Sequence, residues 1–408
     1  MFDVTQIRKD FPMLRGLKMQ NKDFIYFDNA ATTLKPYCVI NAIKDYYENY
    51  SMNTHRGDYD FAYKADEAYE ESRQIVASFI GAKKTEIAFT SGASMGLNVI
   101  AYGWKKFLTK EDEILLTEAE HASNVLPWFR VKEEVGCKIS YIPLDEDGKC
   151  TPENLRKVIS SKTKIVSLAH ITNVLGFEND IKELCKIAHE YGAIFVCDGA
   201  QSVPHMKIDV KDLDVDFLTF SGHKMCGPTG IGVLYGKFEL LDKIDPLLLG
   251  GGMNSTFSLC GDVSLLLPPT KFEAGTQNIE GVIGLGAAIK YLEKIGMSNI
   301  EKYERELRAY LIKKIKQVPN IILYNEKAST GIVTFNIKGI HAQDESSLLN
   351  SKGICVRSGQ HCAKLLVERF GTDATCRASL YFYNTYAEID AFVSALMEGG
   401  DFLDAFFN

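Results

Sequence analysis

Between residues 80 and 236, short apolar runs alternate with amphipathic stretches. Two of the runs, 165–169 and 194–198, are apolar almost throughout, as strands buried on both faces are. The alternation predicts a mostly parallel sheet covered by helices on both faces. The seven predicted strands span 86–90, 113–117, 138–142, 164–169, 193–198, 216–220 and 231–235. The predicted helices between them span 94–107, 122–134, 152–159 and 181–190.

The pattern changes after about residue 265, where two long amphipathic helices are predicted at 280–294 and 300–316. Short runs of both periods follow, including a strand at 374–380 and a helix beginning at Gln360. We therefore predict an α/β protein with two domains: a large domain at 16–265 and a smaller α+β domain at 266–408. The amphipathic stretch at 4–14 is expected to pack on the smaller domain, so residues 1–15 are assigned to it.

Composition narrows the class of protein. The chain has 408 residues, of which 46% are hydrophobic and 24% charged, as in ordinary globular proteins. Its net charge of −7 argues against a general nucleic-acid binder. The N-terminus has no signal-peptide pattern, and no apolar run reaches the length of a membrane span. A cytoplasmic protein with no membrane association is expected.

The cysteines and histidines indicate neither a metal site nor a disulfide framework. None of the ten cysteines forms a Cys-x-x-Cys pair, and the eight histidines are scattered. Most of the cysteines lie in apolar contexts that suit buried, reduced thiols. Cys362 differs, because Arg357, His361 and Lys364 lie near it in sequence. Positive charge of that kind stabilises a thiolate.

Lys224 lies in a glycine-rich segment directly after the predicted strand 216–220. Open α/β sheets bind ligands at the carboxyl ends of their strands. A lysine in a poorly hydrated, cationic pocket has a lowered pKa and becomes a nucleophilic amine, whereas most lysines are merely solvated. The functional interpretation is Schiff-base chemistry with pyridoxal phosphate. The loop 90–94 joins a strand to a helix and suits a phosphate at the helix N-terminus.

Three further residues carry candidate chemistry beside an ordinary alternative. Asp198 ends the predicted strand 193–198 and could cap a helix or hold a pyridinium nitrogen protonated. His121 lies at another strand end and could be structural, or could stack on a cofactor ring and exchange a proton. Arg377 lies in an apolar run and needs a partner, which an internal carboxylate or a substrate carboxylate could supply equally well.

Nine segments, taken together and in order, resemble the fold-type I pyridoxal-phosphate enzymes. More narrowly, they resemble the SUF-type (group II) cysteine desulfurases and their selenocysteine-lyase relatives. The segments span nearly the whole chain: Tyr26–Thr32, Thr54–Gly57, Glu120–Asn124, His170–Gly176, Asp198–Gln201, Ser221–Lys224, Phe272–Thr276, Arg357–Cys362 and Arg377–Asn384.

The resemblance implies a role for each matching residue. Lys224 is expected to form the Schiff base, with Asp198 on the pyridine nitrogen, Gln201 on the phenolic oxygen and His121 stacked on the ring. The phosphate is expected to be held by Ser221, His223 and the loop of Gly92, Ala93 and Ser94, with Thr276 supplied by the partner subunit of a homodimer. Asn173, Arg357 and Arg377 are expected to bind substrate, with Arg377 on its carboxylate and Arg357 near the nucleophile, Cys362.

The chain departs from the pattern of this family at three places. Ala93 and Ser94 stand where two threonines are frequent, which removes one hydroxyl from the phosphate loop. Gln360 stands where histidine is common, and Lys364 and Leu365 replace a Gln-Pro pair. The last two changes could alter the thiolate or the docking surface for an acceptor, but no catalytic residue is lost.

The predicted function is therefore that of a cysteine desulfurase. L-cysteine would be converted to L-alanine, and its sulfur would become a persulfide on Cys362. The resemblance further implies transfer to a sulfur-acceptor protein and to iron–sulfur cluster assembly. Selenocysteine lyase, cysteine-sulfinate desulfinase and aminotransferase activities would share Lys224 and Asp198, although an aminotransferase has no use for Cys362. A non-catalytic scaffold is a further alternative, which the joint presence of these three residues disfavours.

Overall fold

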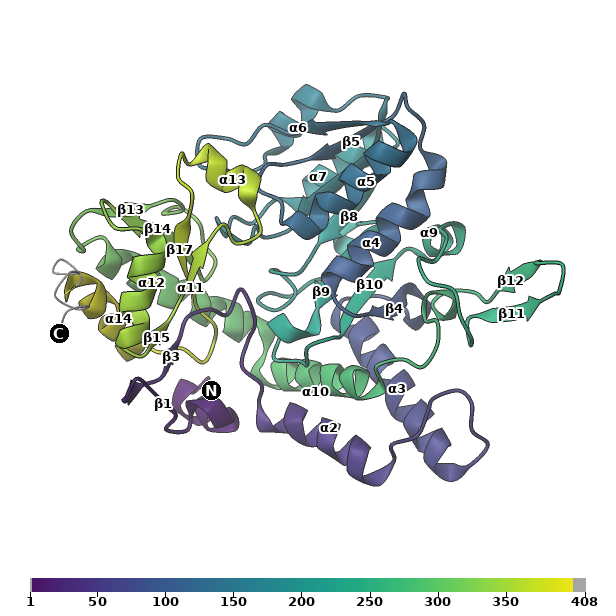
Figure 1. The fold of residues 1–408 in the computed structure, drawn as a ribbon, viewed down its shortest axis with the longest axis horizontal. Coiled ribbons are helices and arrows are strands. Elements are labelled where there is room, and N and C mark those ends of the chain that lie inside the picture. The colour runs from purple at the N-terminus through teal and green to yellow at the C-terminus, as the bar shows by residue number, and fades with distance from the viewer. Residues whose placement is uncertain (1, 399–408) are drawn as a thin grey trace.

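A seven-stranded sheet forms the centre of the larger part of the molecule (Figure 1). The computed structural model describes residues 2–398. Across the sheet the strands are β4 (Ile87–Thr90), β10 (Gly232–Gly236), β9 (Phe217–Ser221), β8 (Ile194–Asp198), β7 (Thr163–Ala169), β5 (Glu113–Leu116) and β6 (Lys138–Tyr141). Only β10 runs against its neighbours. The predicted α/β fold with a mostly parallel sheet is confirmed, and every predicted strand boundary lies within one residue of the observed one.

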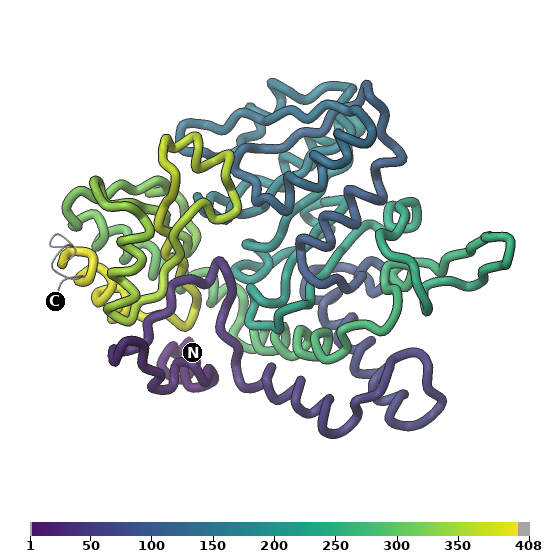
Figure 2. Tube along the Cα trace, in the orientation of Figure 1, coloured from purple at the N-terminus to yellow at the C-terminus, as the bar shows by residue number. Residues whose placement is uncertain are grey.

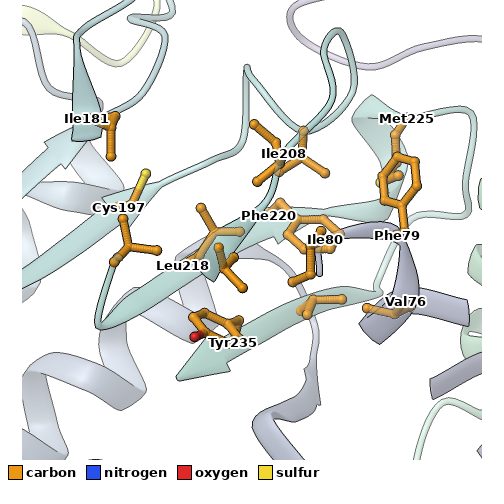
Figure 3. Packing of buried hydrophobic residues seen from close by; sticks show 14 of the residues in the cluster. Val76, Phe79, Ile80, Ile181, Cys197, Ile208, Leu218, Phe220, Met225 and Tyr235 are labelled. Atoms are coloured by element: carbon orange, nitrogen blue, oxygen red, sulfur yellow. The ribbon is translucent and has the colours of Figure 1, made fainter. Parts of the chain in front are cut away.

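Side chains alternate between the two faces of this sheet, and each face has its own layer of helices. On β5, Ile114 and Leu116 join one apolar cluster, whereas Leu115 joins the other. The first face packs on α4 (Ala93–Trp104) and α5 (Leu126–Val135). The second face packs on α3 (Asp60–Phe79), α7 (Ile181–Glu190) and α10 (Ile279–Ile295), and Figure 3 shows part of this cluster.

A smaller antiparallel sheet lies in the C-terminal part of the chain, in the order β13 (Ile321–Leu323), β14 (Ile332–Ile337), β17 (Thr375–Ser379) and β16 (Arg357–Gly359). It has its own apolar cluster, to which three helices contribute. These helices are α11 (Met297–Ile315), α12 (Ala342–Ser351) and α14 (Tyr386–Glu398).

The N-terminal stretch is not a continuous helix, and it runs beside the C-terminal part of the chain (Figure 2). Its Phe11 joins the apolar cluster of the large sheet rather than that of the smaller sheet. The stretch 4–14 contains α1 (Val4–Ile7) and two short 3₁₀ helices. Its Arg8 donates to the carbonyl of Tyr383 at 2.7 Å and pairs with Glu388 at 2.8 Å. Strand β3 (Ile25–Tyr26) pairs in parallel with β15 (Ile354–Cys355). The division of the chain at residues 15 and 265 stays a prediction, and α10, just beyond it, packs on α2 (Tyr37–Asn49) and α3.

A hairpin of β11 (Asn254–Phe257) and β12 (Val263–Leu265) projects from the body of the molecule (Figure 1). It carries apolar side chains into solvent, including Phe257, which is 77% exposed, and Val263, which is 55% exposed. Within residues 2–398, none of the helices combines the length and the apolar character needed to cross a membrane.

Candidate active site

A cavity of about 220 Å³ opens at the carboxyl ends of the parallel strands, facing the smaller sheet. All of the site residues predicted from sequence line it, except Gly92 and Thr276. They are Ala93, Ser94, His121, Asn173, Asp198, Gln201, Ser221, His223, Lys224, Arg357, Cys362 and Arg377. Residues from both sheets thus meet at one place, as expected at the carboxyl edge of such a sheet.

One end of the cavity has the features of an anion cup. Helix α4 begins at Ala93, whose amide donates to the Ser221 hydroxyl at 2.8 Å. The Ser94 and Ser123 hydroxyls lie 2.6 Å apart beside it. Gly92 has a φ of 156°, and a Cβ added there would lie 3.3 Å from the Ser221 hydroxyl. Amides and hydroxyls gathered at the start of a 12-residue helix suit a phosphate.

Thr276 lies in a different cavity, together with Gly230 and Asn278. It therefore does not meet the other predicted phosphate ligands within one chain.

Lys224 ends a short 3₁₀ turn, Gly222–Lys224, that follows β9 directly. Its side chain keeps part of its surface open to the cavity, and protein surrounds the rest. Burial lowers the pKa of this amine to about 8, with Asp198 opposing the shift and Arg377 and Arg357 reinforcing it. A substantial fraction of the amine is therefore uncharged, and so nucleophilic, near neutral pH.

Asp198 ends β8 and is 6% exposed. Its Oδ1 accepts a hydrogen bond from the Ala200 amide at 2.9 Å, within a turn rather than at the start of a helix. Burial raises the pKa of the carboxyl group, while the Ala200 amide and Lys224 lower it. A buried carboxylate of this kind favours a cationic partner in the cavity.

His121 is half-buried and accepts a hydrogen bond on Nδ1 from the Ser123 amide at 3.1 Å. The proton of the neutral ring is therefore on Nε2. Burial lowers the pKa of His121 to about 4, helped by Lys224, Arg377 and Arg357. The imidazole is neutral at pH 7 in this setting.

The loop 173–176 is tied to the smaller sheet by its backbone carbonyls. Four successive carbonyls each accept a hydrogen bond from a side chain of the C-terminal part of the chain. The bonds run from Arg377 Nη1 to Asn173 at 2.8 Å, from Thr334 to Val174, from Asn325 to Leu175 at 2.7 Å and from Thr330 to Gly176 at 2.7 Å. The Asn173 side chain donates in turn to the His361 carbonyl at 2.7 Å, so the loop links Arg377 to the segment that carries Cys362.

Arg377 is 1% exposed and lies 3.3 Å from Asp28. The internal ion pair considered at the sequence level is therefore present. Its Nε nevertheless has no hydrogen-bond partner within residues 2–398. Arg357 also lines the cavity, and no carboxylate of the described residues lies within ion-pair distance of it. Both arginines thus retain donors for an anionic ligand.

Cys362 is exposed and lines the cavity. His361 and Cys362 have φ values of 50° and 57°, in the left-handed region that non-glycine residues rarely adopt. The predicted helix from Gln360 is wrong for this reason, and α13 spans only Lys364–Arg369. The Ala122 amide donates to the Cys362 carbonyl at 2.7 Å, which ties the cysteine to the residue after His121.

Fewer of the basic residues near Cys362 in sequence bring positive charge to it than the sequence implies. His361 is 4% exposed, with Nε2 3.0 Å from the Thr375 carbonyl. Burial, Arg377 and Arg357 lower the pKa of His361 to about 3, so it is neutral at pH 7. Lys364 is exposed and lies 3.7 Å from Glu368. Of the three basic residues, only Arg357 brings a cation to the cavity.

Sequence reasoning missed Asp28, which holds Arg377 from the opposite end of the chain. It noted His361 only as a source of positive charge, whereas the structure has it lining the cavity as a neutral ring. Asp28 lies inside the segment Tyr26–Thr32, which carries part of the family resemblance, so its position was marked although its role was not.

Four buried polar atoms that belong to residues lining this cavity have no hydrogen-bond partner in the described part of the chain. They are Asn173 Oδ1, Gln201 Oε1, His361 Nδ1 and Arg377 Nε. Leaving such groups unpaired costs about 1–3 kcal/mol each, so the cavity is built for a polar occupant. The anion cup, the Lys224 amine with its lowered pKa and the buried carboxylate fit the phosphate, aldehyde and ring nitrogen of pyridoxal phosphate. Among residues 2–398, no cluster of three or more His, Cys, Asp or Glu side chains could hold a metal ion.

Comparison with known proteins agrees with this chemistry. Residues 25–392 match the family Aminotransferase class-V, and the chain belongs to that family. A probable cysteine desulfurase of Halalkalibacterium halodurans is 45% identical over 96% of both chains, and one of Staphylococcus aureus is 42% identical over 98% of both. The apo structure of a cysteine desulfurase from Thermococcus onnurineus NA1 superposes with a TM-score of 0.91 at 41% identity, covering 97% of each chain. The desulfurase CsdA of Escherichia coli gives 0.91 at 35% identity over 99% of each.

These relatives assign the chain to the cysteine desulfurases within the class-V family. The predictions of the fold, of a cysteine desulfurase as the enzyme class and of pyridoxal phosphate as the cofactor are confirmed, and the SUF-type (group II) subgroup stays a prediction. The relatives do not favour the selenocysteine-lyase or sulfinate-desulfinase alternative.

Proposed function

We propose that this chain converts L-cysteine to L-alanine and collects the sulfur as a persulfide on Cys362. The observation that carries the proposal is that Lys224 and Cys362 line one cavity of about 220 Å³, together with the buried Asp198 at the end of β8. An amine nucleophile and a reachable thiol in one cavity suit a reaction that first activates the amino acid and then removes its sulfur.

The cofactor would be held by groups already arranged around the cavity. Ser221, His223 and the backbone at Ala93 and Ser94 would bind its phosphate, and Gln201 would contact its phenolic oxygen. Asp198 would keep the ring nitrogen protonated, and His121 would lie on the ring face. Pyridoxal phosphate bound to Lys224 supplies an electron sink for cleavage at the substrate carbons.

The substrate would be oriented by the donors that the protein leaves unused. Arg377 would donate to the substrate carboxylate, while its hydrogen bonds to Asp28 and to the Asn173 carbonyl fix the orientation of its guanidinium group. Arg357 would add positive charge near the substrate sulfur. Lys224, once displaced by the incoming amine, would take the Cα proton, because its lowered pKa makes it a base near neutral pH.

Sulfur transfer would then occur between two sulfur atoms. The Cys362 thiolate bonds to the substrate sulfur, the carbon–sulfur bond breaks, and its electron pair stays on the carbon fragment. Protonation of that fragment gives L-alanine, so the atoms of L-cysteine are divided between alanine and the persulfide. Attack is fastest for a thiol whose pKa lies near the ambient pH.

The Cys362→Ala variant tests the proposal. We expect alanine formation from L-cysteine to fall by about a hundredfold or more, since the covalent step loses its nucleophile. Peptide mass spectrometry of the wild-type protein after cysteine treatment should find one added sulfur on Cys362. Cys38→Ala and Cys260→Ala are the matched controls, because these are the other exposed cysteines, and both should retain wild-type turnover. Undiminished alanine and sulfide release by Cys362→Ala would refute the nucleophile assignment.

The same measurements separate the alternative substrates. Selenium leaves carbon more readily than sulfur, so a selenocysteine lyase would retain selenocysteine turnover in Cys362→Ala and prefer selenocysteine in the wild type. A preference for L-cysteine in both proteins agrees with the desulfurase proposal.

We further propose a homodimer that passes its persulfide to an acceptor protein for iron–sulfur cluster assembly. Three features support the dimer. The hairpin projects with Phe257 and Val263 exposed, and Leu249, shortly before it in the sequence, is 71% exposed. Thr276 lies outside the cavity that the other predicted phosphate ligands line. The exposure of Cys362 supports delivery to a protein acceptor. Ten free thiols support a reducing, cytoplasmic setting.

A further inference from the structure

One backbone carbonyl next to Lys224 is surrounded by an unusual number of donors. The carbonyl oxygen of His223 accepts the Thr33 amide at 2.9 Å and the Thr33 hydroxyl at 3.1 Å. It also accepts the Thr32 hydroxyl at 3.0 Å and the Lys35 ammonium at 3.0 Å. A carbonyl oxygen has two lone pairs, so four donors exceed its ordinary capacity. His223 immediately precedes the lysine predicted to carry the cofactor.

Lys35 is the charged member of this group, and its charge has no obvious structural use. The side chain is half-buried, and no carboxylate of residues 2–398 lies within ion-pair distance of it. Its ammonium donates only to neutral oxygens, namely the His223 carbonyl, the Thr33 carbonyl and the Thr32 hydroxyl at 3.3 Å. Placing a cation among neutral acceptors costs desolvation that an opposite charge would offset. A shorter neutral side chain would have avoided that cost.

The segment that carries Lys35 holds the turn of Lys224 on both sides. The Thr33 hydroxyl accepts the amide of Cys226, two residues after Lys224, at 2.8 Å. The segment is itself fixed from behind, because the Tyr26 hydroxyl donates to the Thr32 carbonyl at 2.8 Å and the Leu34 amide donates to the Tyr383 hydroxyl at 3.0 Å. The turn is thus held by hydrogen bonds at His223 and at Cys226. The segment that makes these bonds is itself bonded to Tyr383 in the C-terminal part of the chain.

We propose that Lys35 is a positioning residue for Lys224. Its ammonium fixes the His223 carbonyl, and with it the direction from which the Lys224 side chain enters the cavity. Charge-assisted hydrogen bonds are roughly twice as strong as neutral ones, so the ammonium contributes more to this grip than either hydroxyl does. Lys35 is not among the residues that line the cavity, so it would act through Lys224. The inference rests on the proposed role of Lys224 and adds a residue that acts through it.

The test compares covalent attachment with simple binding in the full-length protein freed of cofactor. Pyridoxal phosphate is added, the link to Lys224 is fixed at timed intervals by borohydride reduction, and the labelled peptide is quantified by mass spectrometry. Pyridoxine 5′-phosphate lacks the aldehyde and reports occupancy of the cavity alone, measured by calorimetry. In Lys35→Met we expect attachment to slow by about tenfold to a hundredfold, the scale of a reacting group misplaced by about an ångström. Affinity for pyridoxine phosphate should change by less than about threefold, since Ala93, Ser94 and Ser221 still hold the phosphate.

Two further variants exclude simpler explanations. Lys44→Met is the matched control, because Lys44 is an exposed lysine paired with Glu48 on α2, and its attachment rate should equal that of the wild type. Lys35→Arg keeps a cation within reach of the His223 carbonyl and should recover most of the rate.

Three results would overturn the proposal. They are wild-type attachment in Lys35→Met, equal losses of attachment rate and of pyridoxine phosphate affinity, and an Arg variant as slow as the Met variant. Failure of the proposed function is seen separately, as wild-type protein whose label lies on a lysine other than Lys224.

Discussion

The two reactive residues reach the same cavity from supports of opposite character. Lys224 leaves the large sheet on a short turn that is held at His223 and Cys226, with most of its surroundings made of protein. Cys362 is exposed and lies on a left-handed segment beyond the smaller sheet. Among residues 2–398, only two hydrogen bonds from the large-sheet side hold the backbone of this segment: the Ala122 amide donates to the Cys362 carbonyl, and the Asn173 side chain donates to the His361 carbonyl.

The difference matches what each group has to do. An amine must be poorly hydrated to be uncharged and nucleophilic near neutral pH, and a rigid, enclosed turn achieves this. A thiol that receives sulfur and then hands it on must meet both an enclosed substrate and an outside acceptor. Exposure serves the second need, and the two backbone hydrogen bonds keep the sulfur aimed at the cavity for the first.

The largest loss is expected on the enclosed side, at Asp198. The Asp198→Asn substitution removes the charge but keeps the shape of the side chain and an oxygen that can accept the hydrogen bond from the Ala200 amide. Turnover of L-cysteine should fall by about a hundredfold or more, because the ring nitrogen loses the carboxylate that keeps it protonated. The cofactor-free protein should at the same time unfold at the same or a higher temperature, since burial raises the pKa of this carboxyl and disfavours its charged form.

Steady-state kinetics of the cofactor-loaded protein and thermal unfolding of the cofactor-free protein check the two expectations. Asp180→Asn is a matched control, because the Asp180 side chain caps α7 by accepting the Glu183 amide and does not line the cavity. Wild-type turnover in Asp198→Asn would mean that the enclosed side does not depend on this charge.

An intermediate effect is expected on the exposed side, from Asn173→Ala. The variant removes the hydrogen bond that holds the His361 carbonyl and so loosens the support of Cys362. Persulfide formation in a single turnover should slow by about tenfold even at saturating L-cysteine, while the fraction of Lys224 linked to cofactor stays unchanged. Rapid quenching followed by mass spectrometry of Cys362 measures the rate.

Thr330→Ala serves as the control for Asn173→Ala. It removes the bond to the Gly176 carbonyl in the same loop but leaves the Asn173 side chain on His361. Its rate should stay within about threefold of wild type. If saturating cysteine fully restores Asn173→Ala, the residue binds substrate only, and the exposed side needs no such support.

The same contrast separates what the sequence could predict from what it could not. The seven strands of the large sheet follow from apolar runs of strand length, and their carboxyl ends place Asp198, Ser221 and Lys224 at one edge. That reasoning needs only local periodicity and the general rule for open sheets. The enclosed side of the site was therefore largely predictable.

The exposed side depends on features that periodicity does not encode. Left-handed backbone at His361 and Cys362 interrupts a stretch whose apolar spacing favours a helix, and neither residue is a glycine that would mark the position. The ion pair of Arg377 with Asp28 joins residues 349 positions apart. The neutral state of His361 arises from burial between two arginines, which sequence neighbours do not reveal.

The smallest effect on the reaction is expected from a substitution of Glu345, on a helix that packs on the smaller sheet. This carboxyl group lies on α12, is 1% exposed, and completes no hydrogen bond of good geometry within residues 2–398. Burial raises the pKa of Glu345 to about 8, although the Ile337 backbone and Cys376 oppose the shift. The protonated form is thus favoured in the folded state. Its contribution to stability is complete below the ordinary pKa near 4.5 and is lost as the pH rises towards 8.

Glu345→Gln keeps the neutral form at every pH and should remove this loss. The free energy of unfolding of the variant should gain on that of the wild type by roughly 2–4 kcal/mol between pH 5 and pH 8, measured by urea denaturation. Turnover at pH 7 should not change, because Glu345 does not line the cavity. Glu368→Gln, which alters an exposed carboxylate on α13, should show no such gain. If Glu345→Gln and wild type show the same pH dependence, the loss of stability at alkaline pH arises from another group. The expected gain would assign that loss to the part of the structure that supports the exposed thiol.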